Sequence, residues 1–223
     1  MLDWLIELDK ELLLLCNATH FTWLDNFNFI ITSRWLNVFM VFPLLAILAH
    51  RRKGLEAVIV ILAIALVVLL CDQIASSFFK PTFQRLRPSH DPSLDVVIIN
   101  NYRCGLYGFI SSHAANTFGV AVFLLSLFRH RIFSVAIIMW AVLVSYSRIY
   151  LGVHFPGDIL VGAVVGVLVG WGIYWLYNRL RAFLFSRNLL SVAQNPYRQD
   201  YYARYFAIYI VLLFVILFAI SFL

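Results

Sequence analysis

The sequence predicts an all-α, polytopic membrane protein: a bundle of six transmembrane helices with an N-terminal interfacial helix, forming a single membrane domain over residues 1–223. Hydrophobic residues make up 63% of the chain, against about 45–50% in soluble domains. Charged residues make up only 13%, and the mean hydropathy is +0.88. The apolar residues also gather in stretches long enough to cross a bilayer. This composition excludes a disordered chain, a fibrous repeat and an ordinary soluble enzyme.

The N-terminal segment, residues 1–22, differs from the rest of the chain. Its apolar side chains alternate with acids and then return as a run over Leu12–Leu15. This pattern predicts an amphipathic helix lying on the bilayer surface. The polar face of this helix is acidic and carries Asp3, Glu7 and Asp9, whereas interfacial helices usually carry Lys or Arg there.

Six apolar stretches follow, and we interpret each as a membrane span. A spanning helix needs about 20 residues. The second stretch is the clearest, because its apolar residues are uninterrupted from Ala57 to Leu70. The third and fourth are short and need their polar ends as extra turns. In chain order, the six stretches are Asn26–Ala49, Leu55–Phe79, Ser112–Phe128, Ile132–Tyr146, Ile159–Tyr177 and Tyr205–Leu223.

Basic residues predict the orientation of the bundle. The net charge is +6, and more than half of the 17 Lys and Arg residues lie in three links: residues 51–53, 129–131 and 179–204. All three links fall on the same side, which the positive-inside rule places in the cytoplasm. Both termini and the loops 80–107 and 147–158 then face outward. We therefore expect a multi-pass protein of the cell (inner) membrane with no nucleic-acid partner.

Polar residues are scarce, and three groups of them lie at the outer ends of the predicted spans. The first, Lys80–Pro88, directly follows the second span. The second, Ser111–His113, opens the third span, and the last, Ser147–Asp158, joins the fourth to the fifth. If the helices form a bundle, all three groups converge at one membrane face.

The first chemistry that this set supports is phosphate binding. Lys80, Arg87 and Arg148 supply fixed donors and three positive charges. Ser111 and Ser112 precede a helix, where free backbone N–H groups and the helix dipole favour an anion.

The remaining polar residues support phosphoryl transfer. One histidine of the pair His113 and His154 can attack phosphorus while the other protonates the leaving oxygen. Asp158, four residues after His154, can hold the other ring nitrogen of that histidine and so fix its tautomer and orientation.

These residues carry a family resemblance. The motif Lys80-x6-Arg87-Pro88, the triplet ending in His113, and the motif Ser147-Arg148-x5-His154-x3-Asp158 together resemble the three-part signature of the type 2 phosphatidic-acid phosphatase superfamily. The resemblance implies a catalytic core over residues 55–178, followed by a basic cytoplasmic link and the last span over residues 179–223.

The resemblance also implies the role of each site residue. The activity is that of a phosphatase that needs no metal or other cofactor and forms a phosphohistidine intermediate. By motif position, His154 is the nucleophile, His113 the general acid and Asp158 the residue that orients His154. The phosphate is clamped and hydrogen-bonded by Lys80, Arg87, Arg148, Ser111 and Ser112. The second motif departs from the family pattern, because Ser112 stands where a glycine usually lets the backbone approach the phosphate.

Other interpretations of these residues stay open. His154 and Asp158 have the spacing of a metal pair on a helix, although Pro156 and Gly157 between them argue against a continuous helix. Asp158 can also cap the fifth span, which is compatible with catalysis. The three cationic residues of the set can instead be interfacial anchors.

Two further charged residues lie beside the motifs. Asp72 is about two turns inside the second span and shares a helix face with Ser76 and Lys80. We expect it to support Lys80, with a purely structural hydrogen bond as the alternative. Arg85 is positioned to reach a second phosphate of a diphosphate substrate, or only a lipid headgroup.

The sequence thus predicts an integral-membrane lipid phosphatase that acts on a phosphate or diphosphate at the outer membrane–water interface. The expected partners are the bilayer and a phosphorylated lipid, with no protein partner inferred. Candidate substrates are undecaprenyl diphosphate, phosphatidylglycerol phosphate, phosphatidic acid and lipid A phosphates. The alternatives are a phosphatase of a small soluble phosphate ester and a non-catalytic lipid transporter or scramblase.

Overall fold

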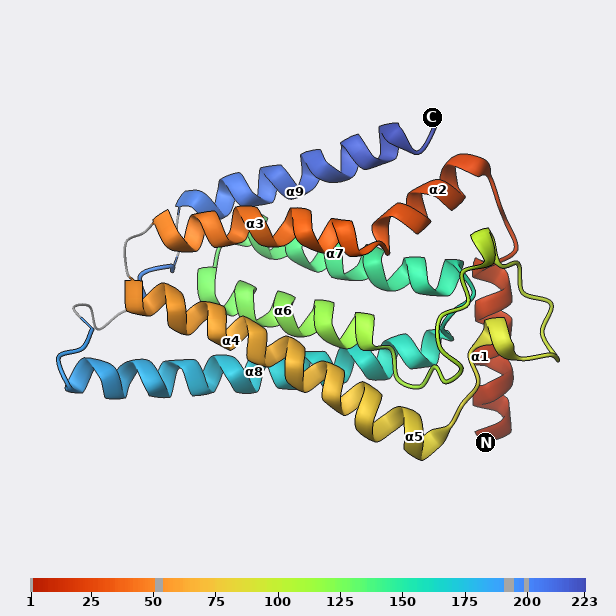
Figure 1. The fold of residues 1–223 in the computed structure, drawn as a ribbon, viewed down its shortest axis with the longest axis horizontal. Helices are drawn as coiled ribbons and strands as arrows, with labels where there is room; N and C mark the ends of the chain where they lie inside the picture. Colours follow the sequence, from red (N-terminus) through yellow and green to blue (C-terminus); the bar gives the residue numbers. More distant parts are fainter. Residues whose placement is uncertain (1, 51–53, 191–194, 199–200) are drawn as a thin grey trace.

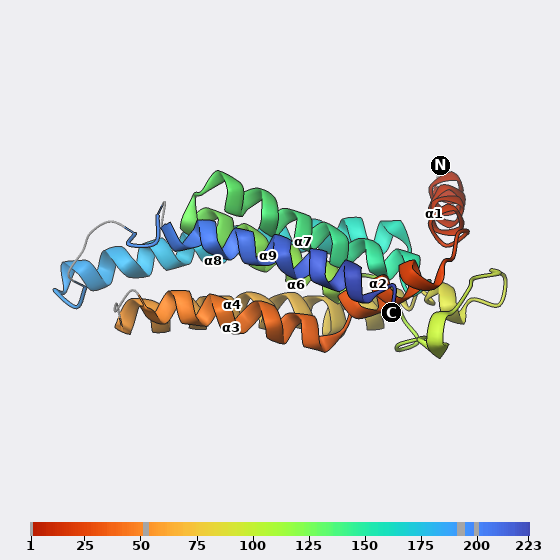
Figure 2. The ribbon, with the colours of Figure 1, turned by 90° about the horizontal axis from the view of Figure 1, so that it is seen from above.

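The computed structural model describes residues 2–50, 54–190, 195–198 and 201–223, and the regular structure in this part of the chain is helical. The long helices from α3 (Arg34–His50) to α9 (Tyr201–Ile220) run side by side along one axis, while α1 (Leu2–Cys16) lies across one end of the bundle (Figure 1). Both chain termini lie toward that same end. The view from above shows α1 nearly end-on, so its axis is roughly perpendicular to the bundle (Figure 2). The predicted N-terminal helix therefore forms, and its geometry suits a helix lying on a membrane surface.

Among the described residues, four helical segments are long and apolar enough to cross a membrane. They are Gly54–Phe83, Arg131–Tyr150, Pro156–Ser186 and Tyr201–Ile220. Two shorter apolar helices, Phe39–Leu48 and Ser112–Phe128, accompany them. The all-α membrane fold is therefore confirmed, whereas the count of six spans stays a prediction.

The first predicted span, Asn26–Ala49, is divided into two helices. Helix α2 (Thr22–Ile31) ends at Thr32, and α3 (Arg34–His50) begins two residues later. The backbone N–H of Thr32 still bonds to the carbonyl of Asn28, but that of Ser33 bonds to Ile30, which closes the helix. The prediction of one continuous helix was wrong because hydropathy does not register a two-residue break. The break leaves the Thr32 side chain buried in the bundle.

The second predicted span is one long helical segment with a change of winding near its end. Helix α4 (Gly54–Gln73) continues into a π-helical segment, η1 (Ile74–Phe79), and then into the short α5 (Lys80–Phe83). Departures to π-helical winding are frequent at functional sites. Here the widened turns lie directly before Lys80, the first residue of the predicted phosphate-binding set.

Helices α6 (Ser112–Phe128) and α8 (Pro156–Ser186) are in unusually close contact. A β-carbon added at Gly162 would lie 2.7 Å from the carbonyl oxygen of Ser111, and at Gly166 it would lie 2.3 Å from that of Ala115. The glycines therefore let the two backbones touch. This contact brings the N-terminal end of α6 against the N-terminal end of α8.

Helix α8 continues well beyond Tyr177, where the fifth span was predicted to end. Its last turns include Arg181, which we had placed in the following link. The guanidinium Nε of Arg181 and the hydroxyl of Tyr177 both lie 2.5 Å from the Glu56 carboxylate on α4, and all three side chains are buried. The helix can continue because this carboxylate neutralises the arginine within the bundle. Of the three basic links, residues 51–53 lie outside the described residues.

Candidate active site

The three polar groups predicted from the sequence meet at the end of the bundle where α1 lies. His113 is in the first turn of α6, and Arg148 is in the last turn of α7 (Arg131–Tyr150). His154 lies in the loop 151–155 before α8, and Arg87 lies in the long loop after α5. Direct contacts join these groups into one cluster. Nη1 of Arg87 lies 2.7 Å from Nε2 of His154, the backbone N–H of His154 donates to the carbonyl of Arg148, and Lys80 donates to Ser112, the neighbour of His113.

His154 is held at both ring nitrogens. Its Nδ1 lies 3.2 Å from Oδ2 of Asp158, and its Nε2 lies 2.7 Å from Nη1 of Arg87. Arginine can only donate, so Nε2 accepts this bond and the ring proton is on Nδ1, from which it is donated to Asp158. The lone pair of a neutral imidazole is therefore on Nε2, beside a phosphate-binding type of side chain. This is the tautomer that a nucleophilic histidine needs.

Asp158 is fully buried and its carboxylate accepts three hydrogen bonds. Besides His154, the backbone N–H of Phe155 donates to Oδ2 at 3.1 Å, and Nη1 of Arg85 donates to Oδ1 at 3.1 Å. The bond from Phe155 caps the first turn of α8, so Asp158 is placed to cap and to orient at once. The two interpretations of Asp158 are compatible in this geometry.

The surroundings of His154 keep its ring neutral. Burial lowers the pKa of His154 well below its usual range, and the positive charges of Arg87, Arg148 and Lys80 lower it further. Both effects disfavour the imidazolium form. His154 therefore carries a free lone pair over a wider acidic range than an exposed histidine does.

The two arginines of the cluster are buried and each keeps an unused donor. Arg148 donates from Nη1 to the hydroxyls of Thr32 at 2.5 Å and Tyr102 at 2.8 Å, while its Nη2 contacts the sulfur of Cys104 at 3.2 Å. Arg87 donates from Nη1 to the carbonyl of Val153 at 2.8 Å. The Nε atoms of both arginines are buried without a hydrogen-bond partner. Unpaired buried donors are costly, and a phosphate oxygen is a suitable acceptor for them.

Lys80 belongs to a chain of polar side chains on the π-helical segment. Its ammonium group donates to the hydroxyl of Ser112 at 2.8 Å and to that of Ser76 at 3.3 Å, and Ser76 lies 3.4 Å from Asp72. The side chain that replaces the usual glycine thus receives a bond from the predicted phosphate-binding lysine. The chain from Asp72 through Ser76 to Lys80 is the arrangement expected if Asp72 supports Lys80.

Ser111 is used structurally at the start of α6. Its hydroxyl oxygen accepts from the N–H of Ala114 at 3.4 Å, and its own N–H donates to the carbonyl of Asp158 at 3.1 Å. The backbone N–H of Ser111 is therefore occupied. Only the hydroxyl hydrogen of Ser111 is left for the phosphate contact that we predicted.

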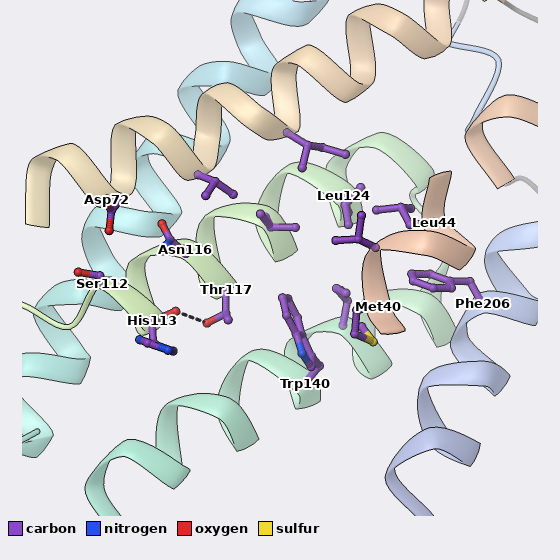
Figure 3. Close-up of a pocket in the computed structure, with 15 residues that line it drawn as sticks. Met40, Leu44, Asp72, Ser112, His113, Asn116, Thr117, Leu124, Trp140 and Phe206 are labelled. Atoms are coloured by element: carbon purple, nitrogen blue, oxygen red, sulfur yellow. Dashed lines mark hydrogen bonds between the residues drawn. The ribbon is translucent and has the colours of Figure 1, made fainter. Parts of the chain in front are cut away.

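An apolar cavity of about 380 Å³ extends from the polar cluster into the bundle. Figure 3 shows Asp72, Ser112 and His113 at one end of it, and Met40, Leu44 and Phe206 at the other. The remaining lining comes mainly from apolar side chains of α3, α4, α6 and α7. A cavity of this size and character, ending at a few polar groups, is typical of sites that bind the hydrocarbon part of a ligand.

Two residues around the cluster were not predicted from the sequence. Thr32 lies at a helix break inside an apolar stretch, and Cys104 lies in a long loop without a recognisable motif. Burial raises the pKa of Cys104, but the positive charge of Arg148 and the hydrogen bonds of the thiol to Tyr102 and Arg148 outweigh this effect. The pKa of Cys104 is therefore lowered. Arg85 contacts Asp158 and Asp9, and its predicted reach to a second phosphate or a headgroup stays a prediction.

Comparison with known proteins identifies the family of this chain. The family model described as the PAP2 superfamily matches residues 56–182, which include all three motifs. The chain belongs to the PAP2 superfamily. The predicted resemblance is thereby confirmed, and so is the predicted activity class, a lipid phosphatase of the membrane.

Two curated relatives of this PAP2 chain are lipid A 4'-phosphatases. The one from Bacteroides thetaiotaomicron is 41% identical over 189 residues, covering 83% of this chain and 84% of the relative. The one from Porphyromonas gingivalis is 41% identical over 184 residues, covering 81% of this chain and 78% of the relative. Among solved structures, Aquifex aeolicus LpxE is 29% identical, with a TM-score of 0.55, and the match covers 73% of this chain and 92% of LpxE.

Proposed function

We propose that this PAP2 phosphatase removes the phosphate monoester of a lipid A-type glycolipid at the outer face of the inner membrane. The observation that carries the chemistry is the position of His154, whose unprotonated Nε2 lies 2.7 Å from a buried arginine. The identity of 41% to two lipid A 4'-phosphatases supports the choice of lipid.

In the first step, Nε2 of His154 attacks phosphorus. The new N–P bond forms as the bond from phosphorus to the leaving sugar oxygen breaks, and His113 donates a proton to that oxygen. Arg87, Arg148 and Lys80 balance the charge on the phosphate oxygens. Asp158 stabilises the imidazolium that forms, because its carboxylate accepts a hydrogen bond from Nδ1–H of His154 and stays ionised.

In the second step, water hydrolyses the phosphohistidine. His113, now neutral, accepts a proton from the attacking water as the O–P bond forms and the N–P bond breaks. Inorganic phosphate leaves and both histidines return to their starting states. Each step moves one proton through His113, so the cycle balances without a further reactant.

The apolar cavity supports a lipid rather than a soluble ester as the substrate. His113 and Ser112 line both the cavity and the polar cluster, so a phosphate at His154 leaves the rest of the lipid next to the cavity. A small sugar phosphate has no group to occupy this space. A lipid transporter would instead need polar residues along a full path, whereas the cavity becomes apolar beyond Asp72, Asn116 and Thr117.

The experiment is a phosphate-release assay with the purified protein in liposomes. The panel contains lipid A, undecaprenyl diphosphate, phosphatidic acid and glucosamine phosphate, with the His154→Ala variant as the matched control. We expect release from lipid A, with mass spectrometry locating the loss at the 4′ position. Faster release from undecaprenyl diphosphate or from the soluble ester would replace the proposed substrate. Lipid movement without any phosphate release would replace the enzymatic function.

The outward orientation has its own test. Asp95 and Arg187 are exposed residues at opposite ends of the bundle, one in the loop near the polar cluster and one at the end of α8. In a Cys104→Ser background, we expect a membrane-impermeant thiol reagent to label Asp95→Cys on intact cells but not Arg187→Cys. The reverse labelling would place the reaction in the cytoplasm.

A further inference from the structure

The carboxylate of Asp9, on the N-terminal helix α1, contacts the active-site end of the bundle. Oδ1 of Asp9 accepts the backbone N–H of Gly157 at 2.6 Å, and Oδ2 accepts Nη2 of Arg85 at 2.7 Å. The Asp9 side chain is 12% exposed, so this contact is largely shielded from solvent. Asp9 had been predicted only as part of an acidic helix face, and neither the family motifs nor the proposed mechanism uses it.

Arg85 links Asp9 to the proposed catalytic residues. Its second terminal nitrogen, Nη1, donates to Asp158 at 3.1 Å, and its guanidinium lies 3.8 Å above the ring of Phe155. Asp158 in turn holds His154 through its other carboxylate oxygen. A continuous series of contacts therefore runs from Asp9 through Arg85 and Asp158 to His154.

The charges along this series alternate in a way that bears on the reaction. Arg85 alone would neutralise Asp158, and a neutral ion pair stabilises an imidazolium less than a free carboxylate does. Asp9 neutralises Arg85 in turn. The three side chains together keep one net negative charge, and Asp158 presents it to His154 in a buried environment where charge interactions are strong.

We propose that Asp9 of the N-terminal helix is a positioning residue for catalysis, because it balances Arg85 and so keeps the charge of Asp158 available to His154. This inference rests on the proposed roles of His154 and Asp158. It makes α1 part of the working enzyme rather than only an interfacial anchor.

The Asp9→Asn variant removes the charge and keeps the contact with α8. The Asn carbonyl oxygen can still accept from Gly157, while its amide nitrogen faces Arg85 as a second donor, so the bond to Arg85 is lost together with the charge. We expect kcat for phosphate release to fall by about 10–100-fold, by analogy with the loss on removing the hydrogen-bond partner of a metal ligand, with KM unchanged. Asp9→Glu keeps the charge and should keep most of kcat. The control is Glu7→Gln, which removes an exposed acid of the same helix that pairs with Lys10 on the surface.

A double variant distinguishes charge balance from simple scaffolding. In Asp9→Asn with Arg85→Gln, the series again has one net negative charge, which is now that of Asp158 alone. We therefore expect kcat to be several-fold higher than in Asp9→Asn alone. Scaffolding predicts the opposite, because two contacts are then lost instead of one. Thermal unfolding in detergent verifies that each variant is folded before its kcat is compared.

The outcomes separate this inference from the proposed function. If the wild-type enzyme and Glu7→Gln release phosphate and Asp9→Asn does so equally well, the role of Asp9 is wrong while the function stands. A double variant as slow as Asp9→Asn would also overturn the role. If the wild-type protein releases no phosphate from any lipid of the panel, it is the proposed function that fails.

Discussion

Replacing Asp158 by asparagine tests the catalytic interpretation of this residue against its role as a helix cap. The carboxylate accepts from Arg85 through Oδ1, and from His154 and Phe155 through Oδ2. An Asn with its amide nitrogen toward Arg85 sets donor against donor. With the nitrogen toward His154, it pushes the ring proton to Nε2, where the proton faces Arg87 and blocks the attack. Neither orientation preserves both contacts, so we expect turnover to fall sharply.

The magnitude follows from the charge that is lost. Opposite unit charges about 4 Å apart attract by about 4 kcal/mol at an effective dielectric constant of about 20. At about 1.4 kcal/mol per factor of ten, this corresponds to a loss of about 10³ in kcat. A serine-protease triad loses about 10⁴ on the same substitution. We therefore expect Asp158→Asn to lose 10² to 10⁴ by these estimates.

The assay is phosphate release at saturating lipid, with Asp95→Asn as the control. Asp95 is an exposed acid of the neighbouring loop, and its amide variant should behave as wild type. The unfolding midpoint of Asp158→Asn in detergent should stay near wild type, because Asn can still accept the capping bond from Phe155. If this variant kept most of its turnover, the carboxylate would be only a cap, and His154 would need another orienting group.

Four further predictions concern the same cluster. Because the pKa of His154 lies below its usual range, its neutral, reactive form should persist as the pH falls. The value of kcat/KM, corrected for substrate ionisation, should therefore decline only well below pH 6.5. A decline centred at pH 6.5 or above would contradict the proposed role of His154 as the nucleophile. Arg148→Lys should lose at least about 10²-fold in kcat/KM, since a point charge cannot also hold Thr32 and Tyr102; near-normal kinetics would make Arg148 an interfacial anchor. Alkylation of Cys104 should inactivate the enzyme, because its sulfur contacts Arg148. Inorganic phosphate bound to Arg148 should slow this inactivation. Inactivation at the same rate with phosphate present would place the thiol outside the phosphate-binding site. Excess EDTA should leave phosphate release unchanged, because cationic side chains balance the substrate charge, and restoration of lost activity by a divalent ion would refute this.

The site was more predictable from the sequence than the helices that carry it. Polar residues are expensive in a membrane bundle, so Lys80, His113 and His154 stood out against an apolar background. Their convergence required only that the spans form a bundle with alternating direction. The residues that complete the cluster carried weaker signals, since Thr32 and Tyr102 lack both charge and a motif.

Where the prediction failed, the missing information was long-range. The end of α8 depends on Arg181, whose partner Glu56 lies at the start of α4, and a local hydropathy window cannot find such a pair. The contacts of Arg85 were missed for the same reason, because its partner Asp9 lies on the N-terminal helix. One signal in the sequence did indicate a partner for the acids of this helix. An interfacial helix with an acidic face lacks the usual attraction to anionic lipids, so its acids are expected to pair with basic residues of the protein.

The close contact between α6 and α8 has a consequence for how the protein is made. His113 enters the membrane with α6, but the glycines that seat α6 and the carbonyl of Asp158 that receives the N–H of Ser111 belong to a helix synthesised later. A nascent chain that has inserted only as far as α7 therefore holds His113, the proposed general acid, without His154, the proposed nucleophile, and without the helix surface against which α6 packs. On the proposed mechanism, the chain becomes active only after α8 has inserted and packed against α6.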